Sequence, residues 1–144
     1  MTSEQRRAIE WDISCLIYKY ANFNDEKRWH ELAAMYTEDG QMIRPAAPEQ
    51  AIVGRAAILA SLLARPAERM TRHICSNVVV TVATATEATA FSNYLIYGGV
   101  RVDDHPVPVL DSKPPVICEF HDRLVCTQDG WRFALRKGVI VFRV

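Results

Sequence analysis

The sequence predicts one α+β domain in which helices gather on one face of an antiparallel sheet, whose long strands curl round a helix and enclose a pocket. Three observations lead to this prediction. The chain has 144 residues, the usual size of a single domain. Its first half carries apolar residues at helical spacing, and its second half carries four long β-branched and aromatic runs. Residues 1–144 are therefore expected to form one domain, without internal repeats or a dividing linker.

A first helix is predicted from a stripe of apolar residues at helical spacing, formed by Ile9, Ile13, Leu16, Ile17 and Tyr20. Thr2 and Gln5 have the spacing of a capping box, which would define the start of this helix. The stripe breaks at residues 21–25.

A short second helix is predicted from the same spacing in Trp29, Leu32, Ala33 and Tyr36. Asn24 or Asp25 is the expected N-cap, and Asp39–Gly40 is the turn expected after the helix. A third helix is predicted to begin at Gly54 and to end at Pro66.

The remaining runs predict the sheet. A short strand is expected at residues 41–44, and long strands are expected at residues 74–83, 88–97, 116–127 and 131–142. Residues 98–115 are rich in Gly, Asp and Pro, which predicts an irregular connection rather than a sheet element. Residues 128–130 predict a hairpin turn between the last two strands.

The composition is that of an ordinary globular protein. Hydrophobic residues make up 49% of the chain and charged residues 24%, which excludes disordered and fibrous classes. Lysine and arginine together number 17, as do aspartate and glutamate, so the net charge offers no attraction for nucleic acid or for an anionic membrane. No apolar run approaches the roughly 20 residues that span a bilayer.

The cysteines and histidines show no metal-binding pattern. Four cysteines are scattered without a CxxC pair, and no basic-then-apolar leader precedes them, so we expect reduced thiols and a cytoplasmic protein. The four histidines lack zinc-site spacing, and no Gly-rich phosphate loop is present. We therefore expect no metal and no cofactor.

Two polar residues are candidates for proton transfer. Asp25 follows the first apolar stripe, where an aspartate either caps a helix or carries function. His73 opens a strand, on a face shared with Cys75 and Asn77. A neutral imidazole acts as a general base when a carboxylate holds its other ring nitrogen, and Asp25 is the candidate carboxylate. The alternative is a structural histidine near a sheet edge.

The last two strands contain further polar candidates. One face of residues 116–127 carries Glu119 and His121, the other carries Asp122, and either face can be the inner one. If the first face lines the pocket, Glu119 and His121 contact a substrate; otherwise they form a solvated ladder. Arg136 is either an anchor for an oxygen-bearing ligand or a surface arginine.

Several motifs occur together in this chain: Asp25 four residues before Trp29, the segment 36–40, the segment 54–58, Arg72–His73 with Asn77, and the segment 120–124 leading to 129–132. In this combination the chain resembles, over nearly its whole length, the SnoaL-like branch of the nuclear-transport-factor-like fold, which includes polyketide cyclases and scytalone dehydratase. The resemblance implies a cone-shaped roll with an internal pocket. This scaffold hosts both enzymes and non-catalytic binders, so the resemblance specifies the fold better than the reaction.

The resemblance also implies roles for individual residues. In scytalone dehydratase and in the similar hexachlorocyclohexane dehydrochlorinase, an aspartate after the first helix and a histidine opening a long strand form the catalytic dyad. Asp25 and His73 fall on these two positions. Tyr20 lies where the dehydrochlorinase has a lysine, and Arg136 matches its last-strand arginine. His121 falls near a pocket asparagine of the dehydratase.

The chain departs from the dehydratase at two positions. The dehydratase has a second histidine where this chain has residues 92–94, and Tyr94 is the expected replacement as a hydrogen-bond donor. Asn24 stands where the dehydratase has a tyrosine, so the substrate need not be shared. The expected substrate-binding residues are Tyr20, Tyr94, His121 and Arg136.

The reaction implied is that of a cofactor-independent lyase or isomerase. His73, oriented by Asp25, would remove a carbon-bound proton from a small cyclic or aromatic-precursor substrate while water or another group leaves. Residues 72–78 and 92–97 also resemble the small subunit of aromatic-ring-hydroxylating dioxygenases, which implies a structural partner of a large iron-bearing chain. A third alternative is a binding domain without turnover. An open sheet with apolar runs predicts a homodimer or homotrimer.

Overall fold

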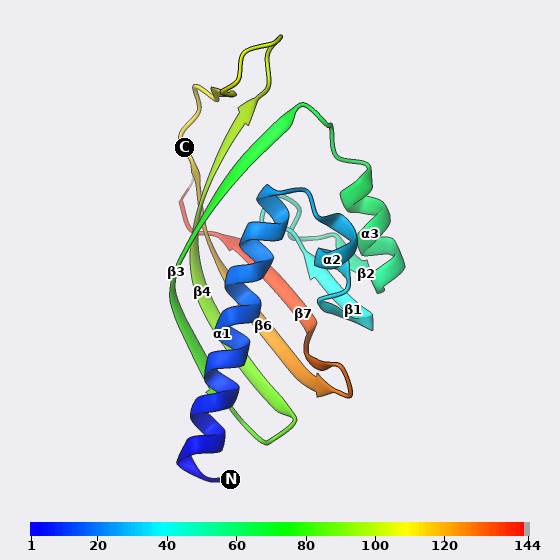
Figure 1. The fold of residues 1–144 in the computed structure, drawn as a ribbon, viewed down its shortest axis with the longest axis vertical. Helices are drawn as coiled ribbons and strands as arrows, with labels where there is room; N and C mark the ends of the chain where they lie inside the picture. The colour runs from blue at the N-terminus through cyan, green and yellow to red at the C-terminus, as the bar shows by residue number, and fades with distance from the viewer. Residues whose placement is uncertain (143–144) are drawn as a thin grey trace.

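The computed structural model describes residues 1–142 and shows helices packed on one face of a strongly curved sheet (Figure 1). The helices are α1 (Ser3–Asp25), α2 (Trp29–Ala33) and α3 (Arg55–Leu63). The strands are β1 (Tyr36–Ile43), β2 (Ala51–Val53), β3 (Arg69–Val82), β4 (Glu87–Val100), β5 (Val109–Leu110), β6 (Val116–Thr127) and β7 (Gly130–Ile140). The predicted α+β class is confirmed.

The sheet follows the order β2-β1-β7-β6-β4-β3, and β5 pairs with β4. Strands β3, β4, β6 and β7 form antiparallel neighbours, but β1 runs parallel to β7. The sheet is therefore mixed rather than purely antiparallel. The long strands β3 and β4 bend around α1, which lies along the inner face (Figure 1). This curvature creates the space in which a pocket forms.

Helix α1 begins as predicted, with both hydrogen bonds of the Thr2–Gln5 capping box. It does not break at residues 21–25, because Ala21 and Asn24 are buried and continue the inward stripe of Ile17 and Tyr20. The helix ends instead in a Schellman turn after Asp25.

In this turn the N–H of Arg28 donates to the carbonyl of Phe23, and the N–H of Lys27, at φ 57°, donates to that of Asn24. Asn24 and Asp25 thus belong to α1, and the expectation that one of them caps α2 is wrong. Helix α2 follows Arg28, which makes no side-chain capping bond.

Further boundaries differ from the prediction. Strand β3 begins at Arg69 rather than at residue 74, so His73 lies within the strand and does not open it, and β2 lies where no strand was predicted.

Residues 36–40 were expected to contain the end of the second helix and the turn that follows it, but they lie in β1. The pairing of β1 with β7 shifts register between Tyr36 and Gln41. Residues 98–115 contribute the end of β4 and the two-residue strand β5, so this connection does contain sheet structure. Both elements depend on pairing with distant strands, which short local patterns do not reveal.

A β-bulge in β3 determines which of its residues face the helix. Pairing with β4 shifts between Ser76 and Val79, and Asn77 adopts a positive φ of 53°. The bulge changes the inward set from odd to even residues. His73 and Cys75 therefore face inward, but Asn77 is exposed and does not share their face.

Strand β6 turns its even-numbered residues inward. Cys118, Phe120, Asp122 and Leu124 are buried, whereas His121 and Arg123 are exposed. No helix in residues 1–142 combines the length and hydropathy needed to cross a membrane.

Replacement of Ile13 by alanine tests the packing of α1 on the sheet. Ile13 is completely buried, so Ile13→Ala is expected to lower the free energy of unfolding by about 2–5 kcal/mol. Trp11 on the same helix is 70% exposed, and Trp11→Ala should change it by less than about 0.5 kcal/mol. Urea denaturation measures both, and equal losses would contradict the described packing.

Candidate active site

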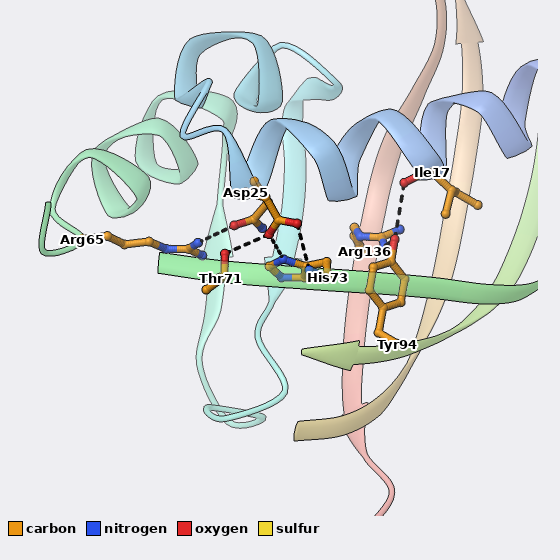
Figure 2. Close-up of polar contacts among 8 residues, drawn as sticks. Ile17, Asp25, Arg65, Thr71, His73, Tyr94 and Arg136 are labelled. Atoms are coloured by element: carbon orange, nitrogen blue, oxygen red, sulfur yellow. Dashed lines mark hydrogen bonds and ion pairs between the residues drawn. The ribbon is translucent and has the colours of Figure 1, made fainter. Parts of the chain in front are cut away.

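The end of α1 and the start of β3 bring Asp25 and His73 together (Figure 2). The Asp25 carboxylate accepts three hydrogen bonds from β3. The backbone N–H of His73 donates to Oδ2 at 2.8 Å, and the Thr71 hydroxyl donates to Oδ1 at 2.9 Å. Nδ1 of the His73 ring lies 2.5 Å from Oδ1. These contacts fix the position of both side chains.

The electrostatics of the pair define the state of the imidazole. The side chains of Asp25 and His73 are only 5% and 9% exposed. Burial disfavours the charged carboxylate, but the hydrogen bonds from His73 and Thr71 outweigh burial and lower the pKa of Asp25 below its ordinary 3.8. An ionised Asp25 can only accept a hydrogen bond, so Nδ1 carries the hydrogen in this contact, and in the neutral form of the ring Nε2 carries the lone pair. This is the arrangement of a general base.

His73 lines a pocket of about 240 Å³, enclosed by the loop after β1, the end of α1 and the inner faces of β3, β4 and β6. Its apolar walls include Met42, Ile43, Ile96, Val116, Phe120 and Ile140. Tyr20, Thr71 and Tyr94 also line it. Pockets for drug-sized ligands usually span about 300–1,000 Å³, so this one suits a small molecule.

A buried ion pair lies behind the pocket wall. Nη1 of Arg136 on β7 donates to Oδ2 of Asp122 on β6 at 2.5 Å, and both side chains are completely buried. Burial raises the pKa of Asp122 to about 6, although the adjacent Arg136 opposes this rise. Burial also disfavours the charged guanidinium, but Asp122 and nearby tyrosines outweigh it and raise the pKa of Arg136.

Arg136 acts on the pocket through aromatic rings rather than by lining it. Its guanidinium carbon lies 4.3 Å from the ring centres of Tyr20 and Phe120, both of which line the pocket. Complete burial corrects the expectation that Arg136 itself anchors a substrate. Its role here is to hold the wall in place.

Tyr94 presents its ring, not its hydroxyl proton, to the pocket. The hydroxyl accepts a hydrogen bond from Nη2 of Arg136 at 2.9 Å and donates to the carbonyl of Ile17 at 3.3 Å (Figure 2). Its single proton is therefore directed at α1, which corrects the expectation of a donor to the substrate. The ring packs edge-on against His73, with centroids 6.1 Å apart.

Tyr20 has a different hydrogen-bonding pattern. Its hydroxyl lies 3.1 Å from that of Tyr36, which is completely buried. Burial raises the pKa of Tyr36 well above its usual value, so Tyr36 keeps its proton. Either hydroxyl can be the donor in this contact. When Tyr36 donates, the proton of Tyr20 is not used in this contact.

His121 lies outside the pocket. Its side chain is 52% exposed on the outer face of β6, and Nε2 lies 3.0 Å from the Glu119 carboxylate. The buried neighbours Phe120 and Asp122 show that the even-numbered face is the inner one. The expectation that His121 contacts the substrate is therefore wrong for this pocket.

Three polar residues that line the pocket were missed by the sequence analysis, namely Arg44, Arg65 and Thr71. Arg44 follows β1 and Arg65 follows α3, and both line the pocket. Nη1 of Arg65 donates to the Asn24 side-chain oxygen at 2.9 Å. Neither arginine belongs to a periodic stripe, so no local signal marked them. Thr71 could have been predicted from the sequence, because it precedes His73 by two residues and therefore shares its face of the strand.

Within residues 1–142, no group of three or more His, Cys, Asp or Glu side chains is placed to hold a metal ion. The four cysteines are free thiols. Cys75 packs against the core beside His73, and burial raises its pKa, which keeps it protonated at neutral pH. The polar chemistry of the pocket therefore centres on His73.

Comparison with known families gives one match. Residues 5–137 match the model of the SnoaL-like domain. No curated protein matches the sequence.

Solved structures share the fold at low sequence identity. A Novosphingobium aromaticivorans protein provisionally described as a scytalone dehydratase has 20% identity and a TM-score of 0.82, over 98% of this chain and 89% of that one. A type 2 hexachlorocyclohexane dehydrochlorinase has 14% identity and a TM-score of 0.78, over 98% and 90%. A second N. aromaticivorans protein, provisionally described as an aromatic ring hydroxylase, has 17% identity and a TM-score of 0.77, over 94% and 91%. These likenesses establish the nuclear-transport-factor-like cone fold.

The lowered pKa of Asp25 predicts an acid-dependent loss of stability. Between the lowered value and 3.8, the folded chain binds fewer protons than the unfolded chain, so the free energy of unfolding falls as the pH decreases through this window. Asp25→Asn removes this contribution and should show a shallower decline. Urea denaturation between about pH 6 and about pH 3 measures the difference. Identical pH dependence in both proteins would contradict the assignment.

The ion pair behind the pocket predicts a strong asymmetry between single and double replacement. Asp122→Asn leaves Arg136 as a buried charge without a carboxylate and should lower the free energy of unfolding by about 3–5 kcal/mol. The double variant Asp122→Leu with Arg136→Met should lose less, because no charge remains buried. Urea denaturation compares the two variants. A larger loss in the double variant would show that the pair contributes net stability.

Proposed function

The chain belongs to the family of SnoaL-like domains, and from this premise we propose that it is a lyase acting on a small cyclic or aromatic-precursor substrate. The observation that carries the proposal is the contact of 2.5 Å between Nδ1 of His73 and Asp25, in a ring that also lines the pocket. The reaction is the removal of a proton together with water or another leaving group from the neighbouring carbon.

His73 is the proposed general base. Its Nε2 takes a proton from a carbon of the substrate, the electrons of the C–H bond form a double bond to the next carbon, and the leaving group departs with its own bonding pair. Asp25 holds the ring in the required tautomer and stabilises the imidazolium that forms. When the leaving group is hydroxide, it combines with the proton that His73 has taken up and departs as water. The elimination changes no oxidation state of the protein and is proposed to proceed without a cofactor.

Tyr20 is the proposed hydrogen-bond donor to the substrate. Its hydroxyl proton is free for a carbonyl or leaving-group oxygen when Tyr36 donates to it. Partial negative charge that develops on such an oxygen would be stabilised in an apolar pocket. Tyr94 and Phe120 provide flat apolar walls, and Arg136 holds these rings from behind.

The comparisons support a reaction of this type. The first N. aromaticivorans protein is described as a scytalone dehydratase, and the other structure is that of a dehydrochlorinase. Both names denote elimination reactions. The pocket volume of about 240 Å³ favours a small substrate over a multi-ring polyketide. We further propose a cytoplasmic location, since scattered free cysteines are typical of reducing compartments.

One observation favours a second candidate function. The fold is shared with a protein described as an aromatic ring hydroxylase, and exposed apolar side chains mark the outer face of the sheet, namely Ile74, Val79, Ile117 and Val139. This face is suited to a protein partner. In the lyase proposal it is covered by further copies in a homodimer or homotrimer, whereas a hydroxylase subunit would need a large partner chain. Light scattering on the purified chain separates the two cases.

A binding domain would instead show stoichiometric binding without turnover.

Replacement of the two dyad residues tests the lyase proposal. With a substrate found by screening small hydroxylated and halogenated rings, His73→Ala should lower kcat/KM by about 10²–10⁴-fold, the usual contribution of a general base. Asp25→Asn should also lower kcat/KM, because it removes the group that orients the ring. Product formation is followed by the ultraviolet absorbance of the new double bond.

His121→Ala is the matched control. His121 also contacts a carboxylate, that of Glu119, but lies on the outer face, so its replacement should leave turnover unchanged. Unchanged turnover in both His73→Ala and Asp25→Asn would exclude the proposed mechanism.

A further inference from the structure

Two arginines line the pocket without a carboxylate partner. Within residues 1–142, neither Arg44 nor Arg65 takes part in an ion pair. Nε of Arg44 is buried and makes no hydrogen bond. Arg65 directs Nη1 at the Asn24 side chain and stacks on Trp29, with 5.2 Å between its guanidinium carbon and the ring centre. A guanidinium has five N–H donors, so most donors of both residues have no hydrogen-bond partner within residues 1–142.

The two positively charged side chains line the same pocket. Burial lowers the pKa of Arg65, and the charge of Arg44 lowers it further. Both residues flank the same mostly apolar cavity as His73, one from the loop after β1 and the other from the end of α3. A chain with no net charge at neutral pH thus concentrates positive charge at this single place in the pocket.

The buried carboxylates near the pocket are already engaged. Asp25 accepts three hydrogen bonds from β3, and Asp122 is paired with Arg136. Partly buried cations without a counter-charge are costly, and a bound carboxylate would relieve this cost while accepting several N–H donors at once. The pocket is therefore complementary to an organic anion of small size.

We propose that the substrate is a ring compound bearing a carboxylate, which Arg44 and Arg65 bind while His73 faces the carbon to be deprotonated. This inference rests on the proposed function for the direction of the reaction, but anion binding itself does not require turnover. Arg44 and Arg65 are specificity-determining residues in this arrangement. They select the charged end of the substrate and thereby set which ring carbon approaches Nε2 of His73.

The test compares matched acids and amides as probes. Benzoate and cyclohexanecarboxylate are titrated against benzamide and cyclohexanecarboxamide, with binding followed by chemical shifts of the protein amides in NMR spectra at neutral pH. Each carboxylate should bind at least about tenfold more tightly than its amide, which corresponds to about 1.4 kcal/mol. The preference should disappear in Arg44→Gln with Arg65→Gln.

Three further variants serve as controls. Arg65→Lys keeps the charge and should keep part of the preference. Arg123→Gln removes an exposed arginine on the outer face of β6 and should leave the preference intact. His73→Gln removes the proposed base and should also retain it. NMR spectra of each variant report whether it is folded.

The outcomes separate this inference from the proposed function. Equal affinities for acids and amides, failure of both acids to bind, or a preference that survives the double replacement would each overturn the inference. These results leave the His73 mechanism to its own test. A carboxylate preference that depends on Arg44 and Arg65 supports the inference, even if no substrate is turned over.

Discussion

One carboxylate joins the two halves of this molecule. Asp25 ends the first helix and accepts hydrogen bonds from the backbone and side chain of His73 and from Thr71, all on the edge strand β3. An edge strand leaves alternate N–H groups unpaired, and Asp25 satisfies one of them. The same contacts close one end of the pocket and set the tautomer of His73. The same contacts therefore serve both the structural and the proposed catalytic role of Asp25. Denaturation measures the first role and turnover measures the second.

The pocket is apolar at its surface and polar directly behind it. Arg136 and Asp122 neutralise each other beneath a layer of aromatic rings, and Arg136 also fixes the hydroxyl of Tyr94. Buried charges of this kind are costly unless paired, so the ion pair favours this arrangement of the wall. A wall held in this arrangement would keep a substrate in one orientation relative to His73, which general-base catalysis requires. Arg44 and Arg65 are the exception, since both line the cavity and neither has an ion-pair partner among residues 1–142.

Local patterns predicted part of this arrangement and missed the rest for physical reasons. The alternating pattern of residues 116–127 did not show which face of the strand points inward. Packing in the folded chain places Phe120 and Asp122 on the inner face and His121 on the outer face. The bulge at Asn77 altered the face of β3 without a marker in the apolar pattern. Tyr94 lines the pocket, but the direction of its proton depends on the carbonyl of Ile17, 77 residues away.

The sequence by itself determined the helical stripe and capping box of α1, the hairpin at 128–130, the long strands and the family resemblance, because these depend on neighbours within a few residues. It also singled out Asp25 and His73 as a candidate pair. The tertiary structure decided that α1 continues to Asp25, that β1 joins β7 in parallel, that Arg136 is buried behind the wall, and that Arg44 and Arg65 reach the cavity. Each of these outcomes depends on contacts between segments distant in the chain, whose free energies outweigh local propensity.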